Sequence, residues 1–179
     1  MAWRNSASRF GLVTRGLHWG MAALVIFMLS LGTRLADIEP GLANLWLYSL
    51  HKTLGFLVLL LTFVRLIWHR ISPPPPPLGP ATALTHRAAR LTHAAIYLCL
   101  LAIPFSCWIA SSATGLDVMI LDRWTVPAIA PVSEAWEDGF FAAHALLTKA
   151  LMGLLLLHLC GALLRGLSRD GTIGRMIIG

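Results

Sequence analysis

Long apolar runs dominate this 179-residue chain and limit what it can fold into. Four such runs occur, at residues 16–33, 45–68, 91–116 and 139–164. Each supplies the roughly 20 residues, at about 1.5 Å per residue, that a helix needs to cross a bilayer core. We therefore predict an all-α, integral membrane four-helix bundle that forms one domain over residues 1–179. The expected helices lie near residues 12–34, 45–68, 91–113 and 139–165.

The composition excludes an ordinary soluble domain. Hydrophobic residues make up 57% of the chain and charged residues 12%, and the mean hydropathy is +0.73. A soluble four-helix protein needs a polar outer face on each helix, and the residues for such faces are missing. The net charge of +6 does not indicate nucleic acid, because the arginines flank the apolar runs instead of forming a basic surface. The composition predicts membrane lipid, and no nucleic acid, around this chain.

Acidic and basic residues separate to opposite ends of the expected helices. Seven of the eight acidic residues fall in the first and third connections: Asp37, Glu39, Asp117, Asp122, Glu134, Glu137 and Asp138. Basic residues gather in the N-terminal arm, in or beside the second connection, and in the tail: Arg4, Arg9, Arg15, Arg65, Arg70, Arg87, Arg90, Arg165, Arg169 and Arg175. Because cytoplasmic loops carry the excess of Lys and Arg, we predict that both termini are cytoplasmic.

Other segments are less informative about function. Residues 73–77 are five consecutive prolines, which cannot continue a helix and indicate a stiff spacer, with a recognition role as the alternative. The three cysteines lie within apolar runs and are interpreted as packing residues: Cys99, Cys107 and Cys160. No Cys-x-x-Cys-His motif occurs, which excludes covalent attachment of a c-type haem.

Histidines are the main candidates for chemistry. Five of the seven lie inside or at the edge of an expected span, where ionisable residues are costly and therefore candidates for function: His18, His51, His93, His144 and His158. The other two, His69 and His86, lie at the ends of the second connection and are assigned no special role.

The expected topology places these histidines at two depths. His18 begins the first helix near the cytoplasm, whereas His51 begins the second helix near the periplasm. His144 and His158 are fourteen residues apart on the last helix, which corresponds to about 21 Å. Fourteen residues are also four turns at the roughly 3.5 residues per turn of a left-handed bundle seam. We expect two cross-helix pairs, an inner pair (His18 and His158) and an outer pair (His51 and His144).

Paired imidazoles across a bundle are suited to haem iron, which takes one axial ligand above and one below the macrocycle. The simplest alternative is that each histidine separately hydrogen-bonds a neighbouring helix. Zinc or copper fits less well, because soft metal sites favour Cys or Met and each pair lacks the ligands of a closed tetrahedral site. The spacing therefore predicts two haems, with the two histidine pairs as axial ligands.

Three basic residues belong to the same hypothesis. Arg65 follows His51 by fourteen residues, so it either binds a propionate of the inner haem or snorkels to the headgroups. Lys52 is a candidate for an outer-haem propionate, for attracting a small anion, or for anchoring at the interface. Lys149 follows His144 by five residues, with no carboxylate in any expected helix to neutralise it. For Lys149 a propionate contact and a neutral amine both stay open.

Taken together, these motifs resemble the bacterial cytochrome b561 family, and the resemblance covers nearly the whole chain. It rests on His18-Trp19, on His51-Lys52-Thr53-Leu54-Gly55 with Arg65-Leu66, on the proline-rich connection, on His93-x-x-x-Tyr97 with Pro104, on His144 and His158, and on the tail Asp170-Gly171-Thr172-x-x-Arg175-Met176. One departure is visible. Where members of the family often carry a His-His pair after the last ligand, this chain has Leu164 and Arg165.

The resemblance implies a bacterial inner-membrane protein with two b haems on the same histidine pairs, in electron exchange with ubiquinone. In superoxide oxidase-like members, superoxide gives electrons at the outer haem, and ubiquinone is reduced near the inner haem. By that similarity, His93 is a candidate quinone contact or proton donor, assisted by Arg90. Packing of His93 against a neighbour is the alternative.

We therefore expect an oxidoreductase that uses superoxide and ubiquinone. A non-catalytic electron conduit between the quinone pool and a periplasmic or membrane redox partner is the second hypothesis. A membrane protein without redox activity is the third.

Overall fold

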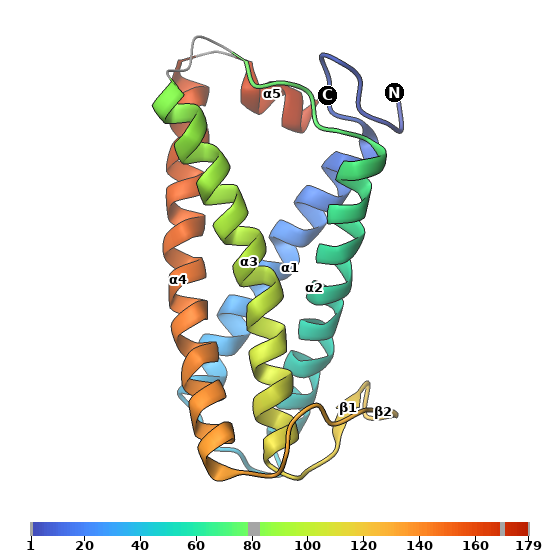
Figure 1. The fold of residues 1–179 in the computed structure, drawn as a ribbon, viewed down its shortest axis with the longest axis vertical. Helices are drawn as coiled ribbons and strands as arrows, with labels where there is room; N and C mark the ends of the chain where they lie inside the picture. The colour runs from blue at the N-terminus through green and yellow to red at the C-terminus, as the bar shows by residue number, and fades with distance from the viewer. Residues whose placement is uncertain (1, 79–82, 169–170, 179) are drawn as a thin grey trace.

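Four long helices form the body of the protein in the computed structural model, which describes residues 2–78, 83–168 and 171–178. They are α1 (Leu12–Ala36), α2 (Leu45–Ile71), α3 (Ala83–Ala113) and α4 (Glu134–Leu167). They run along the long axis of the molecule (Figure 1), and all four contain a span long and apolar enough to cross a membrane. The prediction of an all-α membrane bundle with four spans is confirmed.

All four helices extend beyond the ranges expected from the sequence, and two of them begin well before the expected residue. The expected starts were residues 91 and 139, whereas α3 begins at Ala83 and α4 at Glu134. The difference arises because hydropathy marks only the segment in the apolar part of the bilayer, while backbone hydrogen bonding continues past it. At the start of α4, the side chain of Ser133 accepts a hydrogen bond from Trp136 N, and an acidic first turn favours the helix dipole.

The core is an apolar layer halfway along the bundle. All four helices contribute buried residues to it: Met21, Val25, Val58, Cys99, Leu100 and Leu151. Leu151 lies seven residues after His144 and seven before His158, which is two turns along one seam. The same seven-residue step leads from His18 to Val25 and from His51 to Val58. This layer therefore separates one pair of histidines from the other.

The helices associate as two pairs. α3 and α4 make the most extensive contact, α1 and α2 the next, and α2 with α3 joins the two pairs. By contrast, α1 and α4 pack only loosely against each other. The histidines of α1 and α4 therefore face a part of the bundle that backbone packing does not fill.

The N-terminal arm and the C-terminal helix lie at one end of the bundle, which we call the terminal end (Figure 1). Asn5 fastens the arm, because its Nδ2 donates to Ser72 O at 2.8 Å and its Oδ1 accepts from Gly11 N and Thr14 Oγ1, both at 2.8 Å. A Cβ at Gly11 would lie 2.5 Å from Arg4 O, so only glycine allows this close approach.

The short helix α5 (Thr172–Ile177) is held against the start of α1. Arg15 Nη1 donates to Ile177 O at 2.8 Å, and Trp19 Nε1 donates to Met176 O at 3.0 Å. These bonds satisfy carbonyls at the end of α5 that have no partner within so short a helix. The tail is thus fastened beside His18, the neighbour of Trp19.

A β-hairpin lies at the opposite end, which we call the hairpin end (Figure 1). Strands β1 (Val118–Ile120) and β2 (Trp124–Val126) pair antiparallel, with Val118 opposite Val126. The turn residues Leu121 and Asp122 have φ of 54° and 52°, as in a type I′ turn, although such positions favour Asn or Gly.

Contacts with α2 hold the tip of the hairpin in place. Leu121 N donates to Thr53 Oγ1 at 3.0 Å, and Ser49 Oγ donates to Asp122 Oδ1. Ser49 and Thr53 flank His51 on either side along α2. Because residues two apart on a helix point in nearly opposite directions, the hairpin is fastened to the face of α2 that lies away from the His51 ring.

Candidate cofactor sites

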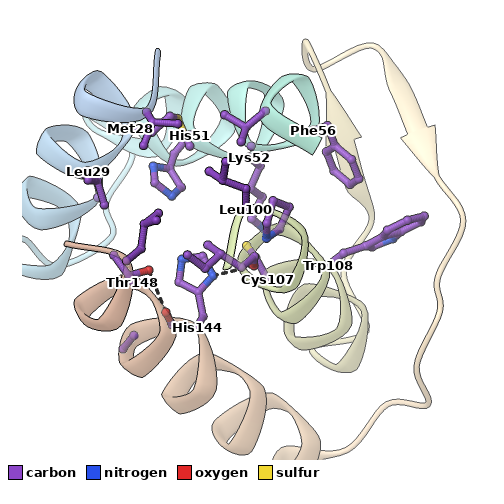
Figure 2. A pocket seen from close by; sticks show the side chains of 18 of the residues that line it. Met28, Leu29, His51, Lys52, Phe56, Leu100, Cys107, Trp108, His144 and Thr148 are labelled. Atoms are coloured by element: carbon purple, nitrogen blue, oxygen red, sulfur yellow. Dashed lines mark hydrogen bonds between the residues drawn. The ribbon is translucent and has the colours of Figure 1, made fainter. Parts of the chain in front are cut away.

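The outer pair consists of His51 on α2 and His144 on α4, near the hairpin end. Their ring centres are 6.3 Å apart and their planes are 73° apart. Figure 2 shows both rings directed into one cavity from opposite helices. The sequence spacing thus predicted correctly that these two residues lie close together.

The cavity between the two rings has a volume of about 470 Å³, within the ~300–1,000 Å³ typical of ligand pockets. Its wall is mainly apolar and includes residues of all four helices together with Val118 of the hairpin. Its polar residues include the two histidines and two lysines, Lys52 and Lys149. An apolar slot with few polar groups suits a large, flat, mostly apolar cofactor.

Hydrogen bonding fixes the orientation of His144. Its Nδ1 lies 3.0 Å from Ile103 O, and Ser106 Oγ donates to the same carbonyl at 2.8 Å. A carbonyl can only accept, so Nδ1 carries the proton and donates it, which leaves the Nε2 lone pair free to bind a metal. This is the kind of outer contact that orients metal-bound histidines.

His51 is positioned by the absence of a side chain on the facing helix. A Cβ built at Gly32 of α1 would lie only 3.1 Å from His51 Cε1. Within the described ranges, His51 Nδ1 is buried and has no hydrogen-bond partner. The position of the His51 ring therefore depends on packing, and the absence of a Cβ at Gly32 leaves the space that the ring occupies.

The separation of the two rings fits a shared metal ion. An imidazole nitrogen binds a first-row metal at about 2.0–2.1 Å. With ring bonds of about 1.33 Å, the ring centre lies about 1.1 Å beyond that nitrogen. Two imidazoles on opposite sides of one ion therefore have centres about 6.3 Å apart, the value found for the outer pair. The residues present fit a haem, whose iron His51 and His144 would hold.

The inner pair repeats this geometry near the terminal end. His18 on α1 and His158 on α4 have ring centres 6.3 Å apart, with planes at 67°. A third ring, His93 of α3, lies 5.1 Å from His158. Arg65 of α2 also contacts this pair: its Nη2 donates a hydrogen bond to His18 Nδ1 at 2.9 Å. The inner site thus has the same ligand geometry as the outer site, with additional polar groups beside it.

Those polar groups come from two helices, each with a four-residue step. Arg65 and His69 lie one turn apart on α2, and His93 and Tyr97 lie one turn apart on α3. The Arg65 guanidinium carbon lies 5.6 Å from the Tyr97 ring centre, and the His69 and Tyr97 ring centres are 6.2 Å apart. Tyr97 Oη is buried and has no hydrogen-bond partner among the described residues. We call these four residues the α2–α3 polar cluster.

Sequence reasoning identified only half of this cluster. It named Arg65 and His93 but assigned no role to His69 and did not consider Tyr97 as a site residue. The available signal was the four-residue spacing, which places each missed residue on the same helix face as a named one. The spacing did not show that these faces of α2 and α3 contact each other.

The remaining predicted residues lie outside these contacts. Arg90 is exposed one turn before His93, and no described hydrogen bond or ring contact joins it to the α2–α3 polar cluster. Leu164 is exposed, and Arg165 Nη1 donates to Leu78 O at 3.0 Å, so Arg165 holds the second connection.

Facing histidine pairs among apolar membrane-spanning helices define a class, the membrane-bound b-type cytochromes. Comparison with known proteins gives the family. The family model of prokaryotic cytochrome b561 matches residues 9–179. The chain is also 32% identical over 181 aligned residues to cytochrome b561 homolog 2 of Escherichia coli (strain K12), which covers 99% of this chain and 95% of that protein. This chain belongs to the prokaryotic cytochrome b561 family, whose members are haem b-binding membrane proteins of electron transfer.

Proposed function

We propose that this protein holds two haems b, one on His51 and His144 and one on His18 and His158, and conducts electrons between them across a bacterial inner membrane. The observation that carries the proposal is the 6.3 Å separation found in both pairs. Haem bound at such sites supplies one-electron oxidation and reduction at iron. Both termini are proposed to be cytoplasmic, which places the hairpin end at the periplasm.

Arg65 has a second task in this proposal. A histidine that binds iron through Nε2 carries a proton on Nδ1, so His18 cannot then accept the hydrogen bond from Arg65. The guanidinium must turn its donors to another acceptor, and a propionate carboxylate of the inner haem is the suitable group. Arg65 is thus proposed to bind that carboxylate in place of its present hydrogen bond to His18.

We propose the α2–α3 polar cluster as the site of ubiquinone reduction. Reduction of a quinone to a quinol takes two electrons and two protons, so the site needs both an electron source and hydrogen-bond donors. His93 touches the ring of His158, a proposed haem ligand, and Tyr97 has a buried hydroxyl without a partner in the described part of the chain. His93 and Tyr97 are therefore suited to donate to quinone oxygens, with Arg90 on the exposed side of the same helix.

The proposed electron donor is superoxide at the periplasmic side. Two superoxide ions each give one electron and leave as O₂, and the two electrons with two protons convert one ubiquinone to ubiquinol. Lys52 borders the outer cavity beside His51, and its positive charge attracts a small anion. The Lys52 ammonium can both attract superoxide and contact a haem propionate.

The second candidate, a non-catalytic conduit to a redox partner, is favoured by the surface of the α3–α4 connection. This segment carries acidic residues and exposed apolar side chains, among them Leu116 (76% exposed) and Trp124 (58% exposed). A basic periplasmic protein fits such a surface. Arg165 also stands where members of the family often have a histidine, and it is engaged with Leu78 O.

Rapid mixing of superoxide with the purified oxidised protein separates these candidates. The proposal predicts reduction of the haems within the mixing experiment, followed by reoxidation when ubiquinone is present. Tyr97→Phe is expected to leave haem reduction unchanged and to slow reoxidation by ubiquinone. The matched control is Tyr48→Phe, because the Tyr48 hydroxyl donates to Ile38 O at 2.9 Å, far from the cluster. Haems that stay oxidised in superoxide, together with a stoichiometric co-purified partner, would establish the conduit instead.

A further inference from the structure

Lys149 is a cation in the middle of a membrane-spanning helix. It lies ten residues after the start of the apolar run 139–164 and fifteen before its end, which is about 15 Å and 22 Å along the helix. A four-carbon stem cannot carry an ammonium over such a distance to either headgroup region. Lys149 therefore does not reach water along the bilayer normal.

No protein carboxylate is available to neutralise it within the spans. Residues 12–36, 45–71, 83–113 and 139–167 contain neither Asp nor Glu. An ionised side chain at this depth is costly, and such groups are found paired or facing an interior cavity. Lys149 is an exposed residue of α4 that stands at the rim of the outer cavity, whose lining also includes His51, His144 and Lys52.

The charge of the cavity wall is complementary to the proposed cofactor. Haem b has two carboxylates, and among the described residues the wall of the outer cavity has two lysines and no acidic residue. Lys149 lies five residues beyond His144, about 7.5 Å further toward the centre of the bundle. Lys52 lies beside His51, on the other side of the cavity from α4.

We propose that Lys149 binds one propionate of the outer haem, so that this site is neutralised by a cation from within the membrane. The inference rests on the proposed occupancy of the outer cavity by haem. It has two consequences. The ion pair slows the loss of the outer haem, and a positive charge held near the iron favours the reduced form, because ferric iron carries one more positive charge than ferrous iron.

The test compares Lys149→Met, Lys149→Arg and Lys52→Met with the wild-type holoprotein. Met has nearly the length of Lys without its charge, and Arg restores the charge. Two readouts apart from activity are used: the rate of haem transfer to excess apomyoglobin, and the midpoint potential of each haem by spectroelectrochemistry. In Lys149→Met, the outer haem is expected to leave about tenfold faster, as for the loss of a charge-assisted hydrogen bond. Its reduction equilibrium should shift about tenfold toward the oxidised form, which is 59 mV for one electron.

Haem dimethyl ester, which lacks the carboxylate charges, isolates the contact itself. When the outer haem is exchanged for this ester, wild type and Lys149→Met should release it at the same rate. The inference is overturned if Lys149→Met retains natural haem as wild type does, if Lys149→Arg fails to restore retention, or if the difference in rate persists with the ester. A wild-type protein with no haem on His51 and His144 would instead overturn the proposed function, and this inference with it.

Discussion

Replacement of Gly32 by alanine tests how closely the fold controls the outer ligand pair. The new Cβ would lie 3.1 Å from His51 Cε1, about 0.4 Å closer than the ~3.5 Å at which carbon atoms attract best. The ring has little freedom to yield, because its distance from His144 already equals the span of two imidazoles on one iron. Displacing a side chain from its preferred conformation costs about 0.5–1.5 kcal/mol. The outer haem should therefore dissociate roughly 2–12 times faster.

Gly20→Ala is the matched control on the same helix. A Cβ at Gly20 meets nothing within 4 Å, so this variant gains the same helix propensity, about 1 kcal/mol, without touching a histidine. Haem transfer to excess apomyoglobin, followed in the Soret band, measures the dissociation rates. The inner haem should leave at the wild-type rate in both variants. Equal outer-haem rates in Gly32→Ala and Gly20→Ala would refute the argument that Gly32 sets the position of His51.

Three further predictions concern the parts that frame the sites. Asn5→Ala removes four side-chain hydrogen bonds of about 1 kcal/mol each, so trypsin should cleave residues 2–11 faster while haem content stays unchanged. Equal cleavage rates would argue against this fastening. Thr53→Val removes the hydroxyl that accepts a hydrogen bond from Leu121 N at the hairpin tip, so limited proteolysis of the hairpin should become about fivefold faster. An unchanged rate would show that other contacts hold the hairpin. Because Leu151 is only 3% exposed, Leu151→Ala should lower the free energy of unfolding by about 2–5 kcal/mol and reduce the thermal midpoint in detergent. The control Leu156→Ala should leave the midpoint unchanged, because Leu156 is 65% exposed. Equal midpoints in the two variants would contradict the apolar layer.

Hydropathy and spacing were sufficient to predict the bundle and the pairing of its histidines. The four apolar runs gave the spans, and the fourteen-residue step from His144 to His158 gave two depths on one face. Arg65, at the same step from His51, was expected at the inner depth and does contact His18. These predictions succeeded because a continuous helix converts sequence separation directly into distance and direction.

The features that were not predicted depend on contacts between segments. The hairpin has strands of only three residues, and its turn is Leu121-Asp122 instead of the usual Asn-Gly, so no local signal marks it. The contact between His69 and Tyr97 depends on how α2 and α3 rotate against each other. The tight approach of His51 to Gly32 likewise arises from packing, which the sequence of either helix alone does not specify.

The pairing of the four histidines is the central claim, and it is tested most directly by haem quantitation with reduced-minus-oxidised spectra. We predict about two b haems per chain in the wild-type protein. His144→Ala should remove mainly the outer haem and His158→Ala mainly the inner one, each leaving about one haem with an intact pair of axial ligands. Full haem content in both variants would contradict the ligand assignment.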